Sequence, residues 1–190
     1  MPISPPQVAA ALIPSLAGVT MVGTGVPKFV QGFGIGLTTW TPTITIRTTD
    51  AGTAGAGKGV PVPISLAPPT LFTNLLAGMV SQGLTGVQSP AFVQGITQGL
   101  VTLYLQAFTN TVHAGVGVGA GVATFSPPPA SSPITTGFAA VGMTGEGALK
   151  LARALAQGLE NTFKVLLLPQ PIVGPPSPVG ASGSGFGSII

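Results

Sequence analysis

The sequence has very little charge. Only six Lys or Arg and three Asp or Glu residues occur among its 190 residues, about a fifth of the share found in ordinary soluble domains. Between positions 59 and 145 no charged residue of either sign occurs. Because mixed surface charge keeps small domains apart in solution, we expect something else to cover this surface, either other protein subunits or lipid.

Groups that carry chemistry are also scarce. The absence of cysteine excludes disulfides, thiolate nucleophiles and thiolate metal sites. The three acidic residues, Asp50, Glu146 and Glu160, lie in segments that look solvated, so no carboxylate pair is available for acid–base catalysis. We therefore predict no enzyme activity, no metal site and no cofactor. His113, the single histidine, is interpreted as a hydrogen-bonded turn residue, the alternative being a metal site shared between symmetric copies.

Long uninterrupted apolar runs are missing as well. The two best segments, 8–26 and 91–108, are broken by Pro14 and glycines in the first and by glutamines and glycines in the second, whereas a membrane-spanning helix needs about 20 apolar residues. Membrane association is therefore not favoured. The six cations are scattered along the chain, while a nucleic-acid surface needs them clustered, so no specific nucleic-acid partner is expected.

What the sequence does contain is a motif that occurs three times. The segment 89–100 begins with Ser89 as a possible N-cap and Pro90 at the first helical position, and its large apolar residues then recur every fourth position. Similar segments stand about sixty residues before and after it, a period typical of repeat proteins. The three apolar stripes are Phe29, Phe33 and Leu37; Phe92, Ile96 and Leu100; and Leu151, Leu155 and Leu159.

These copies divide the chain into three predicted units, 1–66, 67–126 and 127–190. Each unit holds a proline-led helix, a glycine-containing helix, a strand and a glycine-rich loop. The predicted fold class is therefore α+β, with three tandem, diverged helix–helix–strand–Gly-loop repeats. We expect the three stripes to occupy equivalent positions in a shared core and to support assembly.

Within the units the pattern predicts particular elements. A short helix over 8–13 should be ended or kinked by Pro14. Alternation of β-branched and polar residues over 43–48 predicts a half-buried strand, and the apolar run 165–168 predicts a buried one. The strongest predicted helix is 147–163.

Helix-surface ion pairs are predicted at one end of the third unit. Glu146 stands four residues before Lys150, and Glu160 stands four residues before Lys164. This is the spacing at which oppositely charged side chains meet on a helix surface, so we interpret the segment as a solvated face.

The two glycine runs resemble nucleotide-binding motifs only in part. The run 52–59 lacks the Ser or Thr hydroxyl of a P-loop, since Gly59 stands there, and Pro61 and Pro63 exclude the helix that must follow. The run 115–120 is followed by no helix start and by no acidic residue until Glu146. Both runs are interpreted as close-packed turns.

The order of elements within the repeat resembles that of a known protein family. A Pro-Pro-led helix, the pattern Phe92-x-x-Gly95-Ile96-x-x-Gly99-Leu100, a Thr/Val strand and the glycine-rich turn at 50–57 together resemble small virion structural proteins of contractile-tailed phages. The resemblance covers 24–60 and 85–122. It implies a virion location as a tail, neck or baseplate component, bound to other structural subunits as a homo- or hetero-oligomer.

Two other classes of function stay open at this point. The first is a membrane- or envelope-associated hydrophobic protein. The second is a small-molecule binding module with an apolar pocket, although the sequence offers no convergent polar groups for one.

Overall fold

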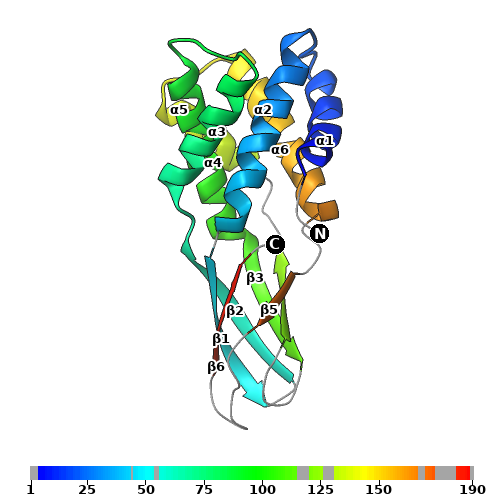
Figure 1. Ribbon diagram of the computed structural model, residues 1–190, viewed down its shortest axis with the longest axis vertical. Coiled ribbons are helices and arrows are strands. Elements are labelled where there is room, and N and C mark those ends of the chain that lie inside the picture. The colour runs from blue at the N-terminus through cyan, green and yellow to red at the C-terminus, as the bar shows by residue number, and fades with distance from the viewer. Residues whose placement is uncertain are drawn as a thin grey trace.

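A computed structural model shows six helices and six strands in the described residues of the chain (Figure 1). The structure describes residues 4–43, 45–53, 56–114, 120–125, 131–166, 170–173 and 183–188, and it describes side chains within 4–43, 66–105 and 133–162. The helices are α1 (Pro5–Gly18), α2 (Gly25–Trp40), α3 (Pro68–Ser81), α4 (Ser89–Ala107), α5 (Ser131–Ala140) and α6 (Glu146–Leu166), with a 3₁₀ turn, η1, at Thr41–Thr43.

The helices form a closed ring of neighbours. Each helix packs against the next one along the chain, and the last helix, α6, packs against the first, α1. Figure 1 shows them gathered in one half of the molecule, with the three helix-to-helix connections at the same end.

The strands are β1 (Thr45–Thr53), β2 (Ala56–Ser65), β3 (Phe108–Ala114), β4 (Ala120–Phe125), β5 (Gln170–Val173) and β6 (Gly183–Ser188). They are paired in one sheet of order β5–β4–β3–β2–β1–β6. Neighbouring strands run antiparallel, and in the first pair Asp50 lies opposite Gly59.

The predicted α+β fold class is wrong for the part of the chain whose side chains are described. That part is 81% helical and contains no strand. What recurs there is a pair of helices rather than a helix–helix–strand–Gly-loop unit. The physical reason is that apolar burial in these segments follows the helical spacing of three and four residues, and helix packs directly on helix. The proposed boundary at 66/67 falls between β2 and α3, whereas the boundary at 126/127 lies outside the described residues.

The first helix of each pair ends in the same way. After α1 the N–H of Met21 donates to the carbonyl of Leu16, 3.0 Å, and the N–H of Thr20 donates to that of Ala17, 2.9 Å. After α3 and α5 the bonds have the same spacing, with donors Leu84 and Gly83 in one and Met143 and Gly142 in the other. These are Schellman turns, which need a left-handed residue just past the helix.

That residue is a glycine in two of the three turns. Gly83 and Gly142 have φ of 74° and 75°, whereas the first turn places Thr20 there with φ of 63°. The three turns therefore have one geometry, although one of them carries a side chain where the backbone favours glycine.

Glycines let the second helix of one pair approach the first helix of the next. A Cβ added at Gly78 of α3 would overlap the carbonyl oxygen of Gly32 in α2, and one added at Gly137 of α5 would overlap that of Gly95 in α4. One turn further along, a Cβ at Gly36 would lie 2.5 Å from the Cα of Leu75. Contacts this short exclude any side chain at these positions.

The third contact, between α6 and α1, closes the ring with larger residues. Ser15 and Ala154 stand where the other two contacts have glycine pairs. Gly158 remains, and a Cβ added to it would lie 3.1 Å from the Cα of Leu12. The seam between the first and last helices is therefore the one at which side chains separate the two backbones.

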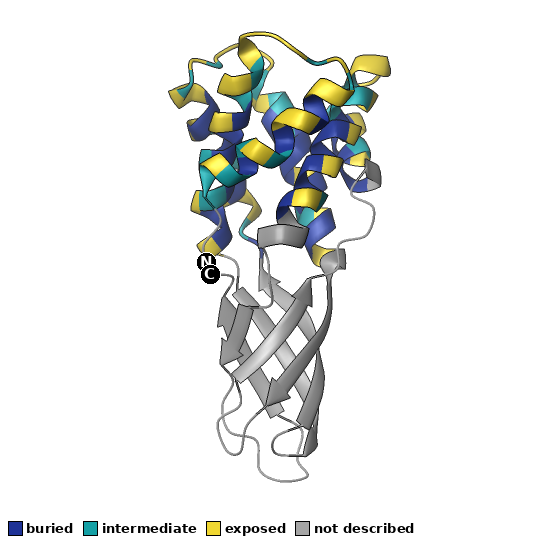
Figure 2. Ribbon diagram, turned by 90° about the vertical axis from the view of Figure 1, so that its right-hand side faces the viewer, coloured by how far each residue is buried: buried dark blue, intermediate teal, exposed yellow. Residues whose placement is uncertain are grey.

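The core runs along the inside of this ring (Figure 2). Equivalent positions of the first helices, Leu12, Leu75 and Ile134, are all fully buried. At the far end of α2 the buried Trp40 packs edge-on against Tyr104, with ring centroids 4.9 Å apart. Its indole Nε1 donates to the carbonyl of Leu66 at 2.7 Å, which fixes the chain just before α3.

Two predicted elements have different bounds in the structure. The helix predicted over 8–13 spans Pro5–Gly18 and continues past Pro14. Pro14 has no backbone N–H, so the carbonyl of Ala10, four residues earlier, lacks its helical hydrogen bond. Both residues are exposed, so water can donate to that carbonyl instead. The strand predicted over 165–168 is wrong at its start, because α6 continues through Leu166 and helical propagation overrides the β preference of a single Val. Residues 167–168 lie outside the described residues.

Candidate functional site

An apolar hollow lies at the end of the helical ring where the connections between paired helices gather. Its volume is about 340 Å³, within the lower range of ligand pockets. The walls come from the α1–α2 connection and from the N-terminal parts of α2, α4 and α6. They are Leu16, Thr20, Met21, Val22, Gly25, Val26, Phe29, Phe92 and Leu151.

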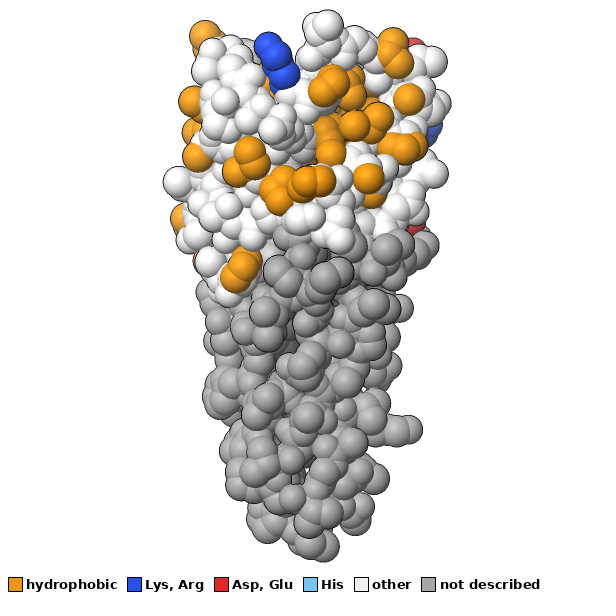
Figure 3. All heavy atoms as spheres, turned by 45° about the vertical axis from the view of Figure 1, so that its right-hand side comes forward, with side chains coloured by type: hydrophobic (Ala, Val, Ile, Leu, Met, Phe, Trp, Pro, Cys, Tyr) orange, Lys and Arg blue, Asp and Glu red, His pale blue; other side chains and the backbone are white. Residues whose placement is uncertain are grey.

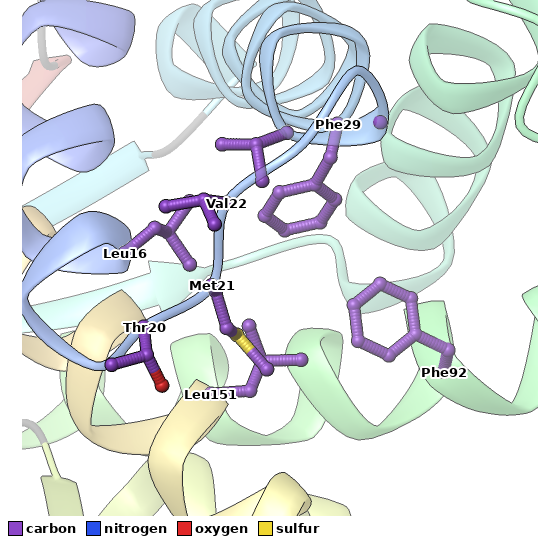
Figure 4. Close-up of a pocket in the computed structure, with 9 residues that line it drawn as sticks. Leu16, Thr20, Met21, Val22, Phe29, Phe92 and Leu151 are labelled. Carbon is purple, nitrogen blue, oxygen red and sulfur yellow. The ribbon is translucent and has the colours of Figure 1, made fainter.

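The first residues of the three apolar stripes meet in this hollow (Figure 4). Phe29 and Phe92 have ring centroids 5.8 Å apart, and Leu151 lines the same space from α6. Phe92 also stacks on Phe138 at 5.7 Å, and Phe29 packs against Phe33 at 6.0 Å. The structure therefore brings together three residues that are far apart in the sequence, one from each unit.

The other stripe residues lie deeper. Each stripe has a partly buried first member, and its second and third members are fully buried in one continuous core. The fully buried residues are Phe33, Leu37, Ile96, Leu100, Leu155 and Leu159. Equal spacing along the helix thus gives equal depth below the open end in all three units.

No charged side chain lines the hollow. Its hydroxyl group, that of Thr20, donates to the carbonyl of Val19 at 2.6 Å. Such a cavity can hold an apolar group by excluding water from it, and its lining supplies no acid, base or nucleophile for chemistry.

The surface around the hollow is also apolar. Val22 at its rim is 77% exposed, and Val87 in the α3–α4 connection is 96% exposed. Figure 3 shows hydrophobic side chains gathered over the upper part of the helical body, with few charged side chains among them. Exposed apolar groups that cluster around a cavity are typical of a surface that meets a partner.

Charge is found on the flank of α6. The predicted pair of Glu146 and Lys150 is confirmed, with the Lys150 Nζ 2.7 Å from a carboxylate oxygen and the two side chains 82% and 45% exposed respectively. The second predicted pair involves Lys164, whose side chain lies outside the described residues. A solvated pair of this kind contributes little to stability.

Other residues considered in the sequence fall outside the described side chains. His113 lies in β3, and positions 56–59 of the first glycine run lie in β2. The segments 54–55 and 115–119 of the two glycine runs are not described at all. The interpretation of both runs as close-packed turns, and that of His113, therefore stay predictions.

Sequence reasoning missed the hollow itself. The stripes are predicted to lie in the core, but nothing in their spacing shows that their first members are only partly buried and leave a hollow between them. The signal lies in the connections, where apolar residues such as Val22 and Val87 stand in short loops that are ordinarily polar.

Comparison with models of known protein families, with curated protein sequences and with solved structures found no match. Within the described residues, no helix combines the length and the apolar character needed to cross a bilayer. Nor do the described residues contain a cluster of three or more His, Asp or Glu side chains able to hold a metal ion.

Proposed function

We propose that the protein is a non-enzymatic structural subunit of a large protein assembly, of the kind found in the tail, neck or baseplate of contractile-tailed phages. The observation that carries this proposal is the open end of the helical ring. There an uncharged hollow of about 340 Å³ is bordered by the strongly exposed Val22.

The composition supports the same function. A chain with 5% charged residues and a mean hydropathy of +0.63 has few groups with which to keep copies apart in solution. Interfaces between permanent partners are depleted in charge and enriched in apolar groups. Low charge and high apolar content are both expected of a protein whose surface is permanently covered by neighbouring subunits.

The competing function is that of an envelope-associated hydrophobic protein, and the same exposed valines favour it. The two functions predict different responses to a mild detergent. Protein contacts that are large and well packed survive mild detergent, whereas association through lipid does not.

The test is fractionation of the native source in the presence and absence of a mild detergent. We expect the protein to sediment with a protease-resistant particle in both conditions. Release into the soluble fraction by detergent alone, together with lipid, would overturn the proposal and favour the envelope-associated function.

A further inference from the structure

The first helix, α1, packs less closely on its neighbour than its two counterparts do. Three equivalent contacts join the second helix of one pair to a first helix, and they are Gly36 with Leu75, Gly99 with Ile134, and Gly158 with Leu12. A Cβ added to the glycine would lie 2.5, 2.8 and 3.1 Å, respectively, from the Cα of its partner. At the α6–α1 seam Ala154 and Ser15 also replace a glycine pair. The backbones are therefore farthest apart where α1 meets α6.

The chain also connects α1 differently from α3 and α5. Strands β1 and β2 join α2 to α3, and strands β3 and β4 join α4 to α5. Helices α6 and α1 lie side by side (Figure 1) but are the last and first of the described helices, so no strand pair joins them in this way. Within the described chain, α1 is joined to the other helices by the connection 19–24 alone.

The turn in this connection is strained. Thr20 has a left-handed φ of 63°, whereas Gly83 and Gly142 hold the equivalent places in the other two turns. Pro14 weakens α1 further, because it lies inside the helix and removes one of its hydrogen bonds, and neither α3 nor α5 has a proline at the equivalent position. A short connection under strain favours opening, since opening relieves the strain.

We infer that α1 is exchanged between two copies of this chain. In the exchanged dimer the α1 of each copy packs against α2 and α6 of the other, as it does within one closed ring. The receiving groove fits α1 because it is the groove that this helix already occupies, and the buried residues that enter it are Val8, Leu12, Ser15 and Leu16. Only the connection 19–24 changes its conformation, so the dimer keeps these contacts and relieves two strained turns.

The kind of partner follows from this fit. A groove shaped by one helix selects that helix, and a second copy of the chain supplies it with every buried side chain in register. The inference goes beyond the proposed function and does not depend on it.

The first test uses two differently tagged forms of the full chain, which has no cysteine of its own. One form carries Leu12→Cys and the other carries Gly158→Cys, at a contact close enough for a disulfide. The two forms are co-expressed, purified together and oxidised. Exchange of α1 brings the two cysteines together in different chains, so we expect a mixed disulfide that joins both tags on a non-reducing gel.

The matched control combines Leu12→Cys with Gln157→Cys. Gln157 stands beside Gly158 in α6, but it is exposed, so this pair measures disulfides that form by random collision. A mixed disulfide that is no more abundant than in the control would overturn the inference.

A second test needs no substitution in the core. Analytical ultracentrifugation measures the dissociation constant of the dimer for the wild type and for Thr20→Gly. Glycine relieves the strained turn of the closed ring in both copies, so we expect this constant to rise about tenfold. The same change at the exposed Thr144, in the connection of the third helix pair, should leave it within about twofold.

A wild-type chain that stays monomeric at high concentration, or a dissociation constant that Thr20→Gly does not raise, would overturn the inference. Neither test uses the native particle, so their outcomes are separate from that of the proposed function.

Discussion

Thr20 is a threonine in a left-handed backbone conformation, with φ of 63°. The equivalent turns place Gly83 and Gly142 in this conformation. A side chain with a branched Cβ costs about 1–2 kcal/mol there, and the hydrogen bond from its hydroxyl to the adjacent Val19 carbonyl offsets only part of that cost.

We therefore predict that Thr20→Gly raises the free energy of unfolding by about 0.5–1 kcal/mol, after allowance for the greater freedom of glycine in the unfolded chain. Urea denaturation followed by the fluorescence of Trp40, the only tryptophan, measures the change. A loss of stability would show that the Thr20 side chain contributes more than its backbone strain removes.

Tyr104 supplies a second test at this scale. Burial raises the pKa of its phenol above the ordinary value of 10.0, so the folded state keeps its proton at a pH where the unfolded chain has lost it. Stability is thus fully present below about pH 10 and falls as the pH rises, by about 1.4 kcal/mol per pH unit. The pH dependence of urea denaturation between about pH 9 and 11.5 measures this slope.

Tyr104→Phe removes the titrating group and should flatten the slope, whatever it does to the stability at pH 7. Equal slopes for the wild type and this variant would mean that the phenol does not carry the alkaline instability.

At the scale of elements, glycine contacts hold neighbouring helix pairs together, Gly32 with Gly78 between α2 and α3 and Gly95 with Gly137 between α4 and α5. A Cβ at Gly78 meets the backbone of α2, which cannot move aside as a side chain would. Gly78→Ala should therefore force α2 and α3 apart and lower the free energy of unfolding by about 2–3 kcal/mol. Thermal unfolding would then shift down by roughly 5–10 °C.

The matched control is Gly147→Ala in α6. Nothing lies within 4 Å of the Cβ it would add, so the helix preference of alanine should raise stability by about 0.5–1 kcal/mol. The two substitutions are chemically identical, so opposite signs isolate the seam contact. If both variants were stabilised, the close approach of α2 and α3 would be refuted.

The sequence predicts features that depend on local spacing, but not those that depend on contacts between helices far apart in the chain. The helices at 29–37 and 147–163 are indicated by apolar spacing, and the structure contains both within α2 and α6. The glycines of α2, which lower its intrinsic helix preference, are explained only by the partner helix that they admit. No local pattern shows which helix that is.

The hollow could not be predicted for a similar reason. Phe29 and Phe92 follow the same spacing as the buried stripe members, and only the closure of the ring decides which end stays open. The α+β prediction was wrong for the part of the chain whose side chains are described, because it treated helix and strand as one repeating unit. In that part only the helix pair repeats.

At the scale of the whole molecule, we propose that the open, apolar end of the ring contacts other subunits. Its rim residue Val22 is 77% exposed, so an aspartate there leaves the fold intact but places a charge where a partner must cover it. The control site is Gln98, which is exposed in the middle of α4 and does not line the hollow, so a charge there stays in contact with water.

The amount of each variant incorporated into the native particle, measured against wild type expressed beside it, tests this assignment most directly. We predict that Val22→Asp lowers incorporation at least about tenfold, which corresponds to about 1.4 kcal/mol of lost contact energy, and that Gln98→Glu stays within about twofold of the wild type. Wild-type incorporation of Val22→Asp, or an equal loss for both variants, would contradict the account.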